Sequence, residues 1–114
     1  MHDPATTDLC PRRAALYAAL AAIPEGSVIG YGKLAELAGL GRGARWVGKV
    51  LGDLPADSRL PWHRVLRSDG RQGLPPDSDA GHEQRQRLAA EGVLLVKGRV
   101  DMRRHGWHPG AGSR

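Results

Sequence analysis

The chain has 114 residues, a formal net charge of +5 and a pI of about 10.1. This length suits one domain with a modest core, and the sequence holds no run of about 18 apolar residues that would predict a membrane span. Phenylalanine is absent and aromatic residues make up only 4%, which argues against an RNA-binding sheet that stacks bases on aromatic rings. The basic charge favours a polyanionic partner, but only the positions of the charged residues can indicate which kind of polyanion it is.

The first residues lack the basic and then apolar pattern of a signal peptide, so we expect a cytoplasmic protein, associated with the nucleoid if the cell is bacterial. The single cysteine, Cys10, cannot form an internal disulfide and is a poor basis for a metal site. We interpret it as structural and expect no metal and no cofactor.

We expect a flexible leader over residues 1–9, one domain over 10–108 and a flexible tail over 109–114. The sequence shows no coiled-coil pattern and no large apolar patch, which favours a monomer.

Apolar spacing predicts the first helix, which begins near Pro11. Leu16, Leu20 and Ile23 follow at i, i+4 and i+7, and the turn-forming Pro24-Glu25-Gly26 then ends the helix. Val28-Ile29 predicts a short extended piece.

Two further short helices, over residues 31–38 and 44–51, are predicted around the glycine-rich turn 39–43. The second of them has an apolar stripe at i, i+3, i+4 and i+7: Val47, Val50, Leu51 and Leu54. Two short helices joined by a tight glycine-containing turn are typical of a helix-turn-helix.

The remaining chain predicts small hairpins and one polar helix. Residues 65–67 and 71–72 flank a turn at 68–70, and residues 93–96 and 99–102 flank Lys97-Gly98. Between them we expect an irregular stretch at 74–77 and a helix over 80–91, capped by Ser78 or Asp79. Trp107 is expected to pack the chain end down. The fold class is therefore mainly α with small β hairpins, in a winged helix-turn-helix arrangement.

The face of helix 44–51 opposite its apolar stripe carries Arg45, Gly48 and Lys49, with Gly52 just beyond the helix. A glycine inside a helix costs roughly 1 kcal/mol relative to alanine, so two on one face need an explanation. Glycines let a nucleic-acid groove wall come close, and Arg42 adds charge nearby. We interpret this face as DNA-docking; a solvated helix that tolerates glycine remains the alternative.

The segment 60–65, Leu-Pro-Trp-His-Arg-Val, is held stiffly because proline fixes its own φ and restricts the residue before it. Taken alone, it is typical of a loop that enters a strand, with Trp62 packed in the core.

Four strings, however, occur together in chain order. They are Tyr-Gly-Lys-Leu-Ala at 31–35, Ala-Arg-Trp-Val-Gly at 44–48, Pro-Trp-His-Arg-Val at 61–65 and Glu-Gly at 91–92. This set resembles the C-terminal domain of the O6-alkylguanine-DNA alkyltransferases, and the resemblance extends from about residue 16 to 107. In that family the third string reads Pro-Cys-His-Arg-Val, and its cysteine accepts the alkyl group. Trp62 stands at that position, which is the mark of the alkyltransferase-like proteins that bind alkylated guanine without repairing it.

The resemblance implies a role for each matching position. Arg45 looks like the arginine finger that fills the gap left by an extruded nucleotide, and Tyr31 like the tyrosine that helps to rotate the nucleotide. The helix with Gly48 would enter the minor groove. The lesion pocket would be formed by Tyr31, Trp62 and Val65, the last through its backbone. The implied DNA-binding set is Tyr31, Arg42, Ala44, Arg45, Trp46, Gly48 and Lys49.

His63 and Glu91 would form the relay that activates a thiol in an active alkyltransferase. A relay of this kind needs sulfur, because the thiolate is the nucleophile and an indole offers no accessible anion near pH 7. We therefore expect a structural remnant and no alkyl transfer.

Several positions depart from the alkyltransferase pattern. Trp46 and Lys49 replace small residues, and Leu54-Pro55 stands where the family has Asn-Pro. The family's Tyr-Ser-Gly-Gly pocket segment is replaced by 74–77, where Pro76 has no N–H to offer. Arg67 or Arg71 could face the lesion, although solvent exposure is the preferred expectation for both.

The expected function is recognition of O6-alkylguanine in duplex DNA by base flipping, which marks the lesion for nucleotide excision repair proteins. Two alternatives stay open. One is a winged-helix regulator that reads a specific operator; the other is an alkyltransferase that uses Cys10, which lies far from His63 in the sequence.

Overall fold

The computed structural model describes residues 11–55 and 57–109. Cys10, the predicted leader 1–9 and residues 110–114 of the predicted tail lie outside the described residues. Within the described ranges, no helix combines the length and the apolar character needed to cross a bilayer.

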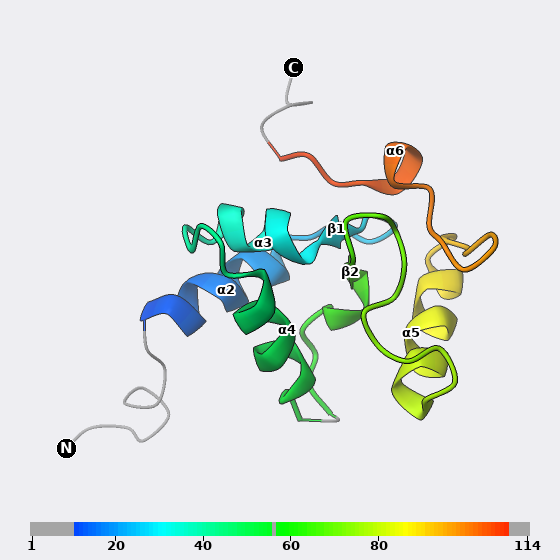
Figure 1. Cartoon of the computed structure of the whole chain (residues 1–114), viewed down its shortest axis with the longest axis horizontal. Coiled ribbons are helices and arrows are strands. Elements are labelled where there is room, and N and C mark those ends of the chain that lie inside the picture. Colours follow the sequence, from blue (N-terminus) through cyan, green and yellow to red (C-terminus); the bar gives the residue numbers. More distant parts are fainter. Residues whose placement is uncertain (1–10, 56, 110–114) are drawn as a thin grey trace.

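The elements follow one another as helices interrupted by very short strands (Figure 1). In chain order they are α2 (Pro11–Ala21), β1 (Ile29–Gly30), α3 (Tyr31–Leu37), α4 (Ala44–Gly52), the 3-10 turn η1 (Trp62–Arg64), β2 (Val65–Leu66), α5 (Asp79–Ala90) and α6 (Met102–His105). The predicted helices are therefore confirmed to within a residue or two at each end.

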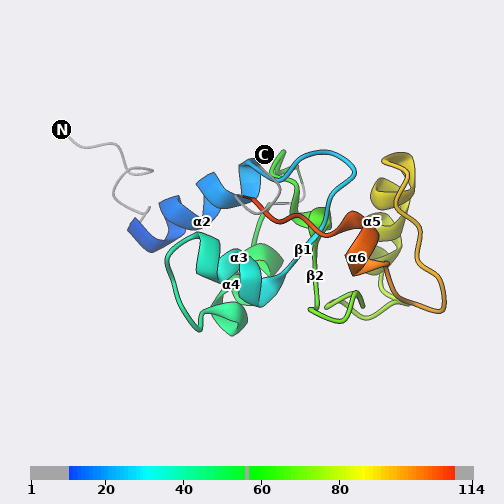
Figure 2. The same cartoon turned by 90° about the horizontal axis from the view of Figure 1, so that it is seen from above.

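The strands β1 and β2 form a parallel pair, with Ile29 opposite Val65 and Gly30 opposite Leu66. Seen from above, α2, α3 and α4 lie on one side of this pair and α5 and α6 on the other (Figure 2). Successive residues of a strand point to opposite faces. Val65 consequently enters one hydrophobic cluster and Leu66 the other.

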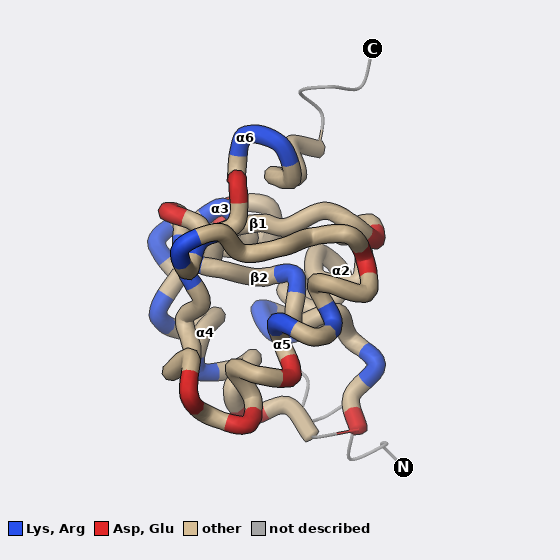
Figure 3. The backbone as a smooth tube through the Cα atoms, turned by 90° about the vertical axis from the view of Figure 1, so that its right-hand side faces the viewer, with Lys and Arg blue, Asp and Glu red and all other residues tan. Residues whose placement is uncertain are grey.

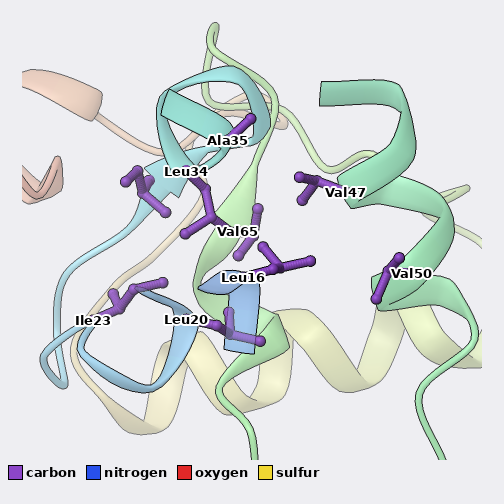
Figure 4. Close-up of a cluster of buried hydrophobic side chains, with 9 residues drawn as sticks. Leu16, Leu20, Ile23, Leu34, Ala35, Val47, Val50 and Val65 are labelled. Carbon is purple, nitrogen blue, oxygen red and sulfur yellow. The ribbon is translucent and has the colours of Figure 1, made fainter. Parts of the chain in front are cut away.

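The larger cluster joins the first three helices to β2 (Figure 4). Its buried members include the predicted apolar positions of α2 and α4 and add residues of α3 and of the two strands: Leu16, Leu20, Ile23, Ile29, Leu34, Ala35, Val47, Val50 and Val65. The smaller cluster packs α5 against the other side through Val28, Leu66, Leu88, Val93 and Val100. Trp107 packs against the larger cluster and its N–H donates to the Val28 carbonyl at 2.7 Å, as predicted for the chain end.

The helix-turn-helix prediction is confirmed, since α3 and α4 pack together and are joined by the turn at 38–43. Gly39 and Gly41 adopt φ of 77° and 61°, a backbone region that costs other residues free energy. Leu40, between them, packs against the larger cluster.

Both predicted hairpin turns are present, but each closes only one pair of residues and no longer strand pairing follows in these described segments. The first turn lies at 68–70 as predicted: the Gly70 N–H donates to the Arg67 carbonyl, and the Arg67 N–H donates to the Arg71 carbonyl at 2.8 Å. The partner of β2 is the distant β1. The turn packs so closely on the chain end that a Cβ on Gly70 would lie 2.3 Å from the Val100 carbonyl oxygen. This contact, invisible in local sequence, holds the turn against the C-terminal segment, where the Val100 N–H donates to the Gly70 carbonyl.

The second hairpin reduces to a bridge between Val96 and Arg99. The predicted strand 99–102 stops because Asp101 caps α6: its carboxylate accepts from the N–H groups of Arg103 and Arg104. An aspartate at this position favours a helix start over a strand. By contrast, Ser78 caps α5 as predicted, accepting from the Gly81 N–H at 3.0 Å.

Candidate functional site

A pocket of about 280 Å³ opens between α4 and α5, next to η1. It brings together three predicted site residues, Tyr31, Gly48 and Trp62, from three different elements. The rest of its lining was not among the predicted pocket residues, although Leu74 lies in the segment that replaces the family's pocket segment: Leu51, Gly52, Leu54, Pro55, Leu74, Asp79, Ala80, Glu83 and Gln84. Most of these side chains are apolar, and Asp79 and Glu83 add two carboxylates from the first half of α5.

Tyr31 is the first residue of α3, and its ring runs along the pocket between two glycines. A Cβ on Gly73 would lie 2.4 Å from the Tyr31 Oη, so only glycine lets the chain pass there without displacing the ring. A Cβ on Gly48 would lie 3.9 Å from the same ring, an ordinary contact. Burial raises the pKa of Tyr31, which keeps the phenol protonated as a hydrogen-bond donor.

Trp62 lies in η1 and is half-buried at the pocket wall. The His63 ring stands almost perpendicular to the indole, at 88° with 6.2 Å between ring centroids. The Arg87 guanidinium of α5 lies over the indole, 5.4 Å from the ring centroid. Trp62 thus lines the pocket, as the family resemblance implied, and is not the fully packed core residue that the segment taken alone suggested.

Behind Trp62, a polar cluster is centred on Glu91, whose side chain is 11% exposed. Its carboxylate accepts from His63 Nε2 at 2.8 Å, from Arg64 Nη2 at 2.6 Å and from the Gly26 N–H at 3.0 Å. Arg64 also donates to the Ile23 carbonyl at 2.7 Å. The predicted pairing of His63 with Glu91 is therefore present, with Arg64 as a member that the sequence did not indicate.

The pKa values of this cluster follow from burial and pairing. Burial by itself would raise the pKa of Glu91, but the hydrogen bonds from Arg64, His63 and Gly26 outweigh it and lower the pKa to about 2. Burial lowers the pKa of His63, against the opposing pull of Glu91. Near neutral pH the cluster thus consists of an anionic Glu91, a cationic Arg64 and a largely neutral His63.

Gln84 is a second buried polar side chain beside the pocket, at 1% exposure. Its Nε2 donates to the carbonyls of His63 and Val65, at 3.2 and 3.0 Å, and its Oε1 accepts from Gln72 Nε2 at 3.0 Å. These bonds fasten η1 and the 72–76 segment to α5. The polar run 83–87 gave no hydropathy signal that would have separated Gln84 from its exposed neighbours.

Val65, predicted to contribute to the pocket, does not line it. Its side chain is buried in the larger cluster. Its N–H donates to the Trp62 carbonyl and its carbonyl accepts from Gln84. Arg67 and Arg71 are about half exposed and pair with Asp69, which agrees with the solvent exposure preferred for them.

The predicted basic residues lie on the outward face of α4 and in the turn just before it. Arg42, Arg45 and Lys49 are exposed, and Lys49 lies 3.7 Å from Asp53. Figure 3 marks the Lys and Arg positions along the chain, including those of α4. Ala44 and Gly48 are half-buried. Trp46, also in the predicted DNA-binding set, is half-buried: it packs against the larger cluster, and the Arg12 guanidinium lies 4.6 Å from its ring centroid.

Comparison with known proteins agrees with this geometry. Residues 11–93 match the family described as the DNA binding domain of 6-O-methylguanine DNA methyltransferase. The chain is 47% identical over 103 residues to a DNA base-flipping protein of Escherichia coli (strain K12), covering 89% of this chain and 76% of that protein. It is 35% identical over 82 residues to alkyltransferase-like protein 1 of Schizosaccharomyces pombe, covering 72% and 76%.

The fold is similar to solved structures of the same kind. S. pombe Atl1 in complex with damaged DNA containing O6-carboxymethylguanine superposes with a TM-score of 0.78 at 31% identity, over 84% of this chain and 94% of that one. Mycobacterium tuberculosis OGT in complex with DNA gives 0.60 at 29% identity, over 68% and 47%. The chain therefore belongs to the alkyltransferase-like proteins, within the O6-alkylguanine-DNA alkyltransferase family.

Proposed function

We propose that this protein recognises O6-alkylguanine in duplex DNA by rotating the damaged nucleotide into the pocket between α4 and α5. The observation that carries the proposal is the position of the pocket, which opens directly beside the glycine-bearing face of the helix we assign to DNA docking. Its volume, about 280 Å³, and its largely apolar wall suit a base with a small substituent. Base flipping costs a few kcal/mol, and less for a lesion that pairs poorly.

Each part of the interface has a role in this proposal. Arg45, exposed in the first turn of α4, fills the gap in the duplex, while Tyr31 lies beside the flipped base. Trp62 offers an apolar surface to the alkyl group. Contacts to the groove and backbone come from Arg42 in the turn before α4 and from Ala44, Gly48 and Lys49 on the outward face of α4. The carbonyl of Val65 is already engaged by Gln84, so the pocket side chains bear more of the recognition than the sequence suggested.

We propose further that no alkyl group is transferred. Trp62 replaces the acceptor thiol, and Glu91 is held as an anion by Arg64 as well as by His63. The former relay acts as a structural clamp for η1. A single-turnover assay with a duplex carrying labelled O6-methylguanine tests this. We expect all label to stay on the DNA, and label bound covalently to the protein would contradict it.

The alternative of an alkyltransferase that uses Cys10 is tested in the same assay. Blocking the thiol with an alkylating reagent should leave DNA binding unchanged. Loss of binding, or of any label transfer, after the block would favour Cys10 instead.

A protein that holds the lesion without mending it marks the site. We propose that it acts as a monomer where the chromosomal DNA lies, with residues 10–108 as the working domain, and that it hands the lesion to nucleotide excision repair proteins. A defined in vitro excision assay on one alkylated duplex, with and without the protein, tests this handover. We expect faster incision with the protein present; unchanged or slower incision would contradict it.

A sequence-specific regulator remains the second candidate, because the helix-turn-helix and the basic face would serve it too. Arg45→Ala separates the two. A lesion reader should lose most of its preference for alkylated over intact duplex, whereas a regulator should show preference for sequence and none for damage. Affinities for methylated, larger-alkyl and unmodified guanine in one sequence context provide the measurement, and Arg104→Ala controls for the loss of one charge.

A further inference from the structure

Arg87 lies outside the predicted site, yet it is the one charged side chain of the described residues that stacks on Trp62. Its guanidinium is 5.4 Å from the centroid of the indole, within the range over which a cation is attracted to an aromatic face. α5 runs beside η1, so the contact joins two elements 25 residues apart in the chain (Figure 1).

The guanidinium is itself held in place. Arg87 Nε donates to Glu83 Oε2 at 2.8 Å, one helical turn earlier in α5, and the two side chains are 35% and 48% exposed. Glu83 lines the pocket. The Glu83 carboxylate therefore contacts the Arg87 guanidinium, which in turn contacts the Trp62 indole. Glu83 and Trp62, at the two ends of this series, both line the pocket.

The indole has a second neighbour in His63, whose ring is perpendicular to it. His63 is fixed by Glu91, and its exposure is only 7%. Trp62 is thus confined by a buried ring on one side and by a half-exposed cation on the other. Of these two restraints, only Arg87 can be removed without disturbing the buried cluster.

We propose that Arg87, held by Glu83, is a positioning residue that orients the Trp62 indole as the pocket wall before DNA arrives. This inference rests on the proposed function, since an oriented wall matters only if the pocket receives the damaged base. A preformed wall spares the cost of ordering the ring during binding. Because Arg87 is engaged by Glu83 and Trp62, it need not contact a DNA phosphate even though it lies close to the pocket.

A simpler reading is that Glu83 and Arg87 form an ordinary i,i+4 surface pair that stabilises α5 slightly. The two readings differ in what they predict. A helix-stabilising pair changes the melting temperature only, while a positioning residue changes the ratio of affinities for alkylated and intact duplex.

The experiment measures this ratio for wild-type protein, Arg87→Ala, Arg87→Lys and Glu83→Gln. We expect Arg87→Ala to lower it roughly two- to fivefold, the factor that corresponds to a partly exposed cation–π contact. Arg87→Lys should recover part of the preference. Glu83→Gln should lower the ratio in the same direction, because it releases the guanidinium. Arg87→Met, which keeps the length of the side chain without its charge, replaces the alanine variant if circular dichroism shows that variant to be unfolded.

Two matched variants separate general effects from specific ones. Gln86→Ala, exposed on the same helix, should leave the ratio unchanged, and Arg104→Ala should lower both affinities equally if it lowers them at all. An unchanged ratio in Arg87→Ala, or an equal loss for both duplexes, would overturn the positioning role. Equal affinity of the wild type for both duplexes would instead overturn the proposed function, and the inference with it.

Discussion

At the scale of single residues, Glu91 connects more of the molecule than any other charged side chain described above. It joins Arg64 and His63 of η1 to the Gly26 backbone, so it fixes the loop that carries Trp62. A buried ion pair gains little over a well-packed apolar replacement, but breaking it leaves an uncompensated charge. The value of Glu91 is therefore in the geometry it imposes on the pocket wall.

Glu91→Gln should destabilise the protein by about 3 kcal/mol, because Arg64, whose side chain is only 15% exposed, would lose its counter-charge. Urea unfolding monitored by tryptophan fluorescence measures this. Glu36→Gln is the control: its pair with Lys33 is more than half exposed on both sides, and its loss should cost under about 1 kcal/mol. Equal effects of the two substitutions would contradict the assignment.

The pH dependence of stability follows from the same residues. The pKa of Glu91 is about 2 in the folded protein against 4.5 ordinarily, so the unfolded chain takes up this proton first and stability is lost as pH falls from about 4.5 towards 2. The pKa of His63 is also below its ordinary 6.5, so below about pH 6.5 the unfolded chain binds this proton more readily than the folded protein. The stability that the neutral imidazole contributes is therefore lost as the pH falls below about 6.5. Thermal unfolding between pH 7.5 and 3 should show both losses, and Glu91→Gln should remove the more acidic one. A stability that rises on acidification would contradict both pKa directions.

At the scale of elements, α4 combines a buried stripe with a face that carries two glycines, Gly48 and Gly52. The stripe is explained by packing alone. The glycines are not, since a Cβ at Gly48 would make only an ordinary contact with Tyr31 and one at Gly52 would meet nothing within 4 Å. Both positions have room for a side chain in the unbound protein. The absence of side chains there agrees with a helix face that a partner approaches closely.

Gly48→Ala should therefore raise the free energy of unfolding by up to about 1 kcal/mol, as expected for alanine in a helix, while weakening DNA binding. Thermal unfolding and a binding titration, run side by side, check the opposite signs. Gly32→Ala, in α3 with nothing within 4 Å of its Cβ, should change stability similarly and leave binding intact. Tighter DNA binding by Gly48→Ala would remove the argument for a groove-facing glycine.

At the scale of the whole molecule, the β1–β2 pair separates two hydrophobic clusters, and the pocket opens between the elements that those clusters anchor. α4 belongs to the larger cluster and α5 to the smaller one. The two walls of the pocket are thus each held by a different hydrophobic cluster. Gln84 of α5 donates a hydrogen bond to the His63 carbonyl of η1. Small changes in how the two parts pack would alter the pocket directly.

The net charge of +5 predicts binding that weakens steeply with salt, with a slope of log affinity against log salt near −0.9 for each neutralised phosphate. Lys49→Ala should reduce the magnitude of the slope by about 0.9 if this side chain leaves Asp53 to contact a phosphate. Arg104→Ala on α6 should leave the slope unchanged. Fluorescence-anisotropy titrations at several salt concentrations measure it, and a Lys49→Ala slope equal to wild type would place Lys49 outside the interface.

The sequence by itself determined the helices α2 to α5, the helix-turn-helix and most of the candidate site residues, whereas α6 formed where a strand was predicted. Periodic apolar positions and glycine turns are local signals, and Leu16, Val47 and Gly39 behave as their spacing indicated. The pairing of His63 with Glu91 and the place of Trp62 came from the motif, which the sequence also carries.

Only the tertiary structure decided the strand partners and the walls of the pocket. β1 pairs with a segment 36 residues away, and the turn at Gly70 packs on Val100; both depend on contacts between distant parts of the chain. Gln84, Arg64 and Arg87 are indistinguishable in sequence from surface residues, because their roles arise from what faces them across the fold. Long-range burial, which no local pattern encodes, is the physical reason.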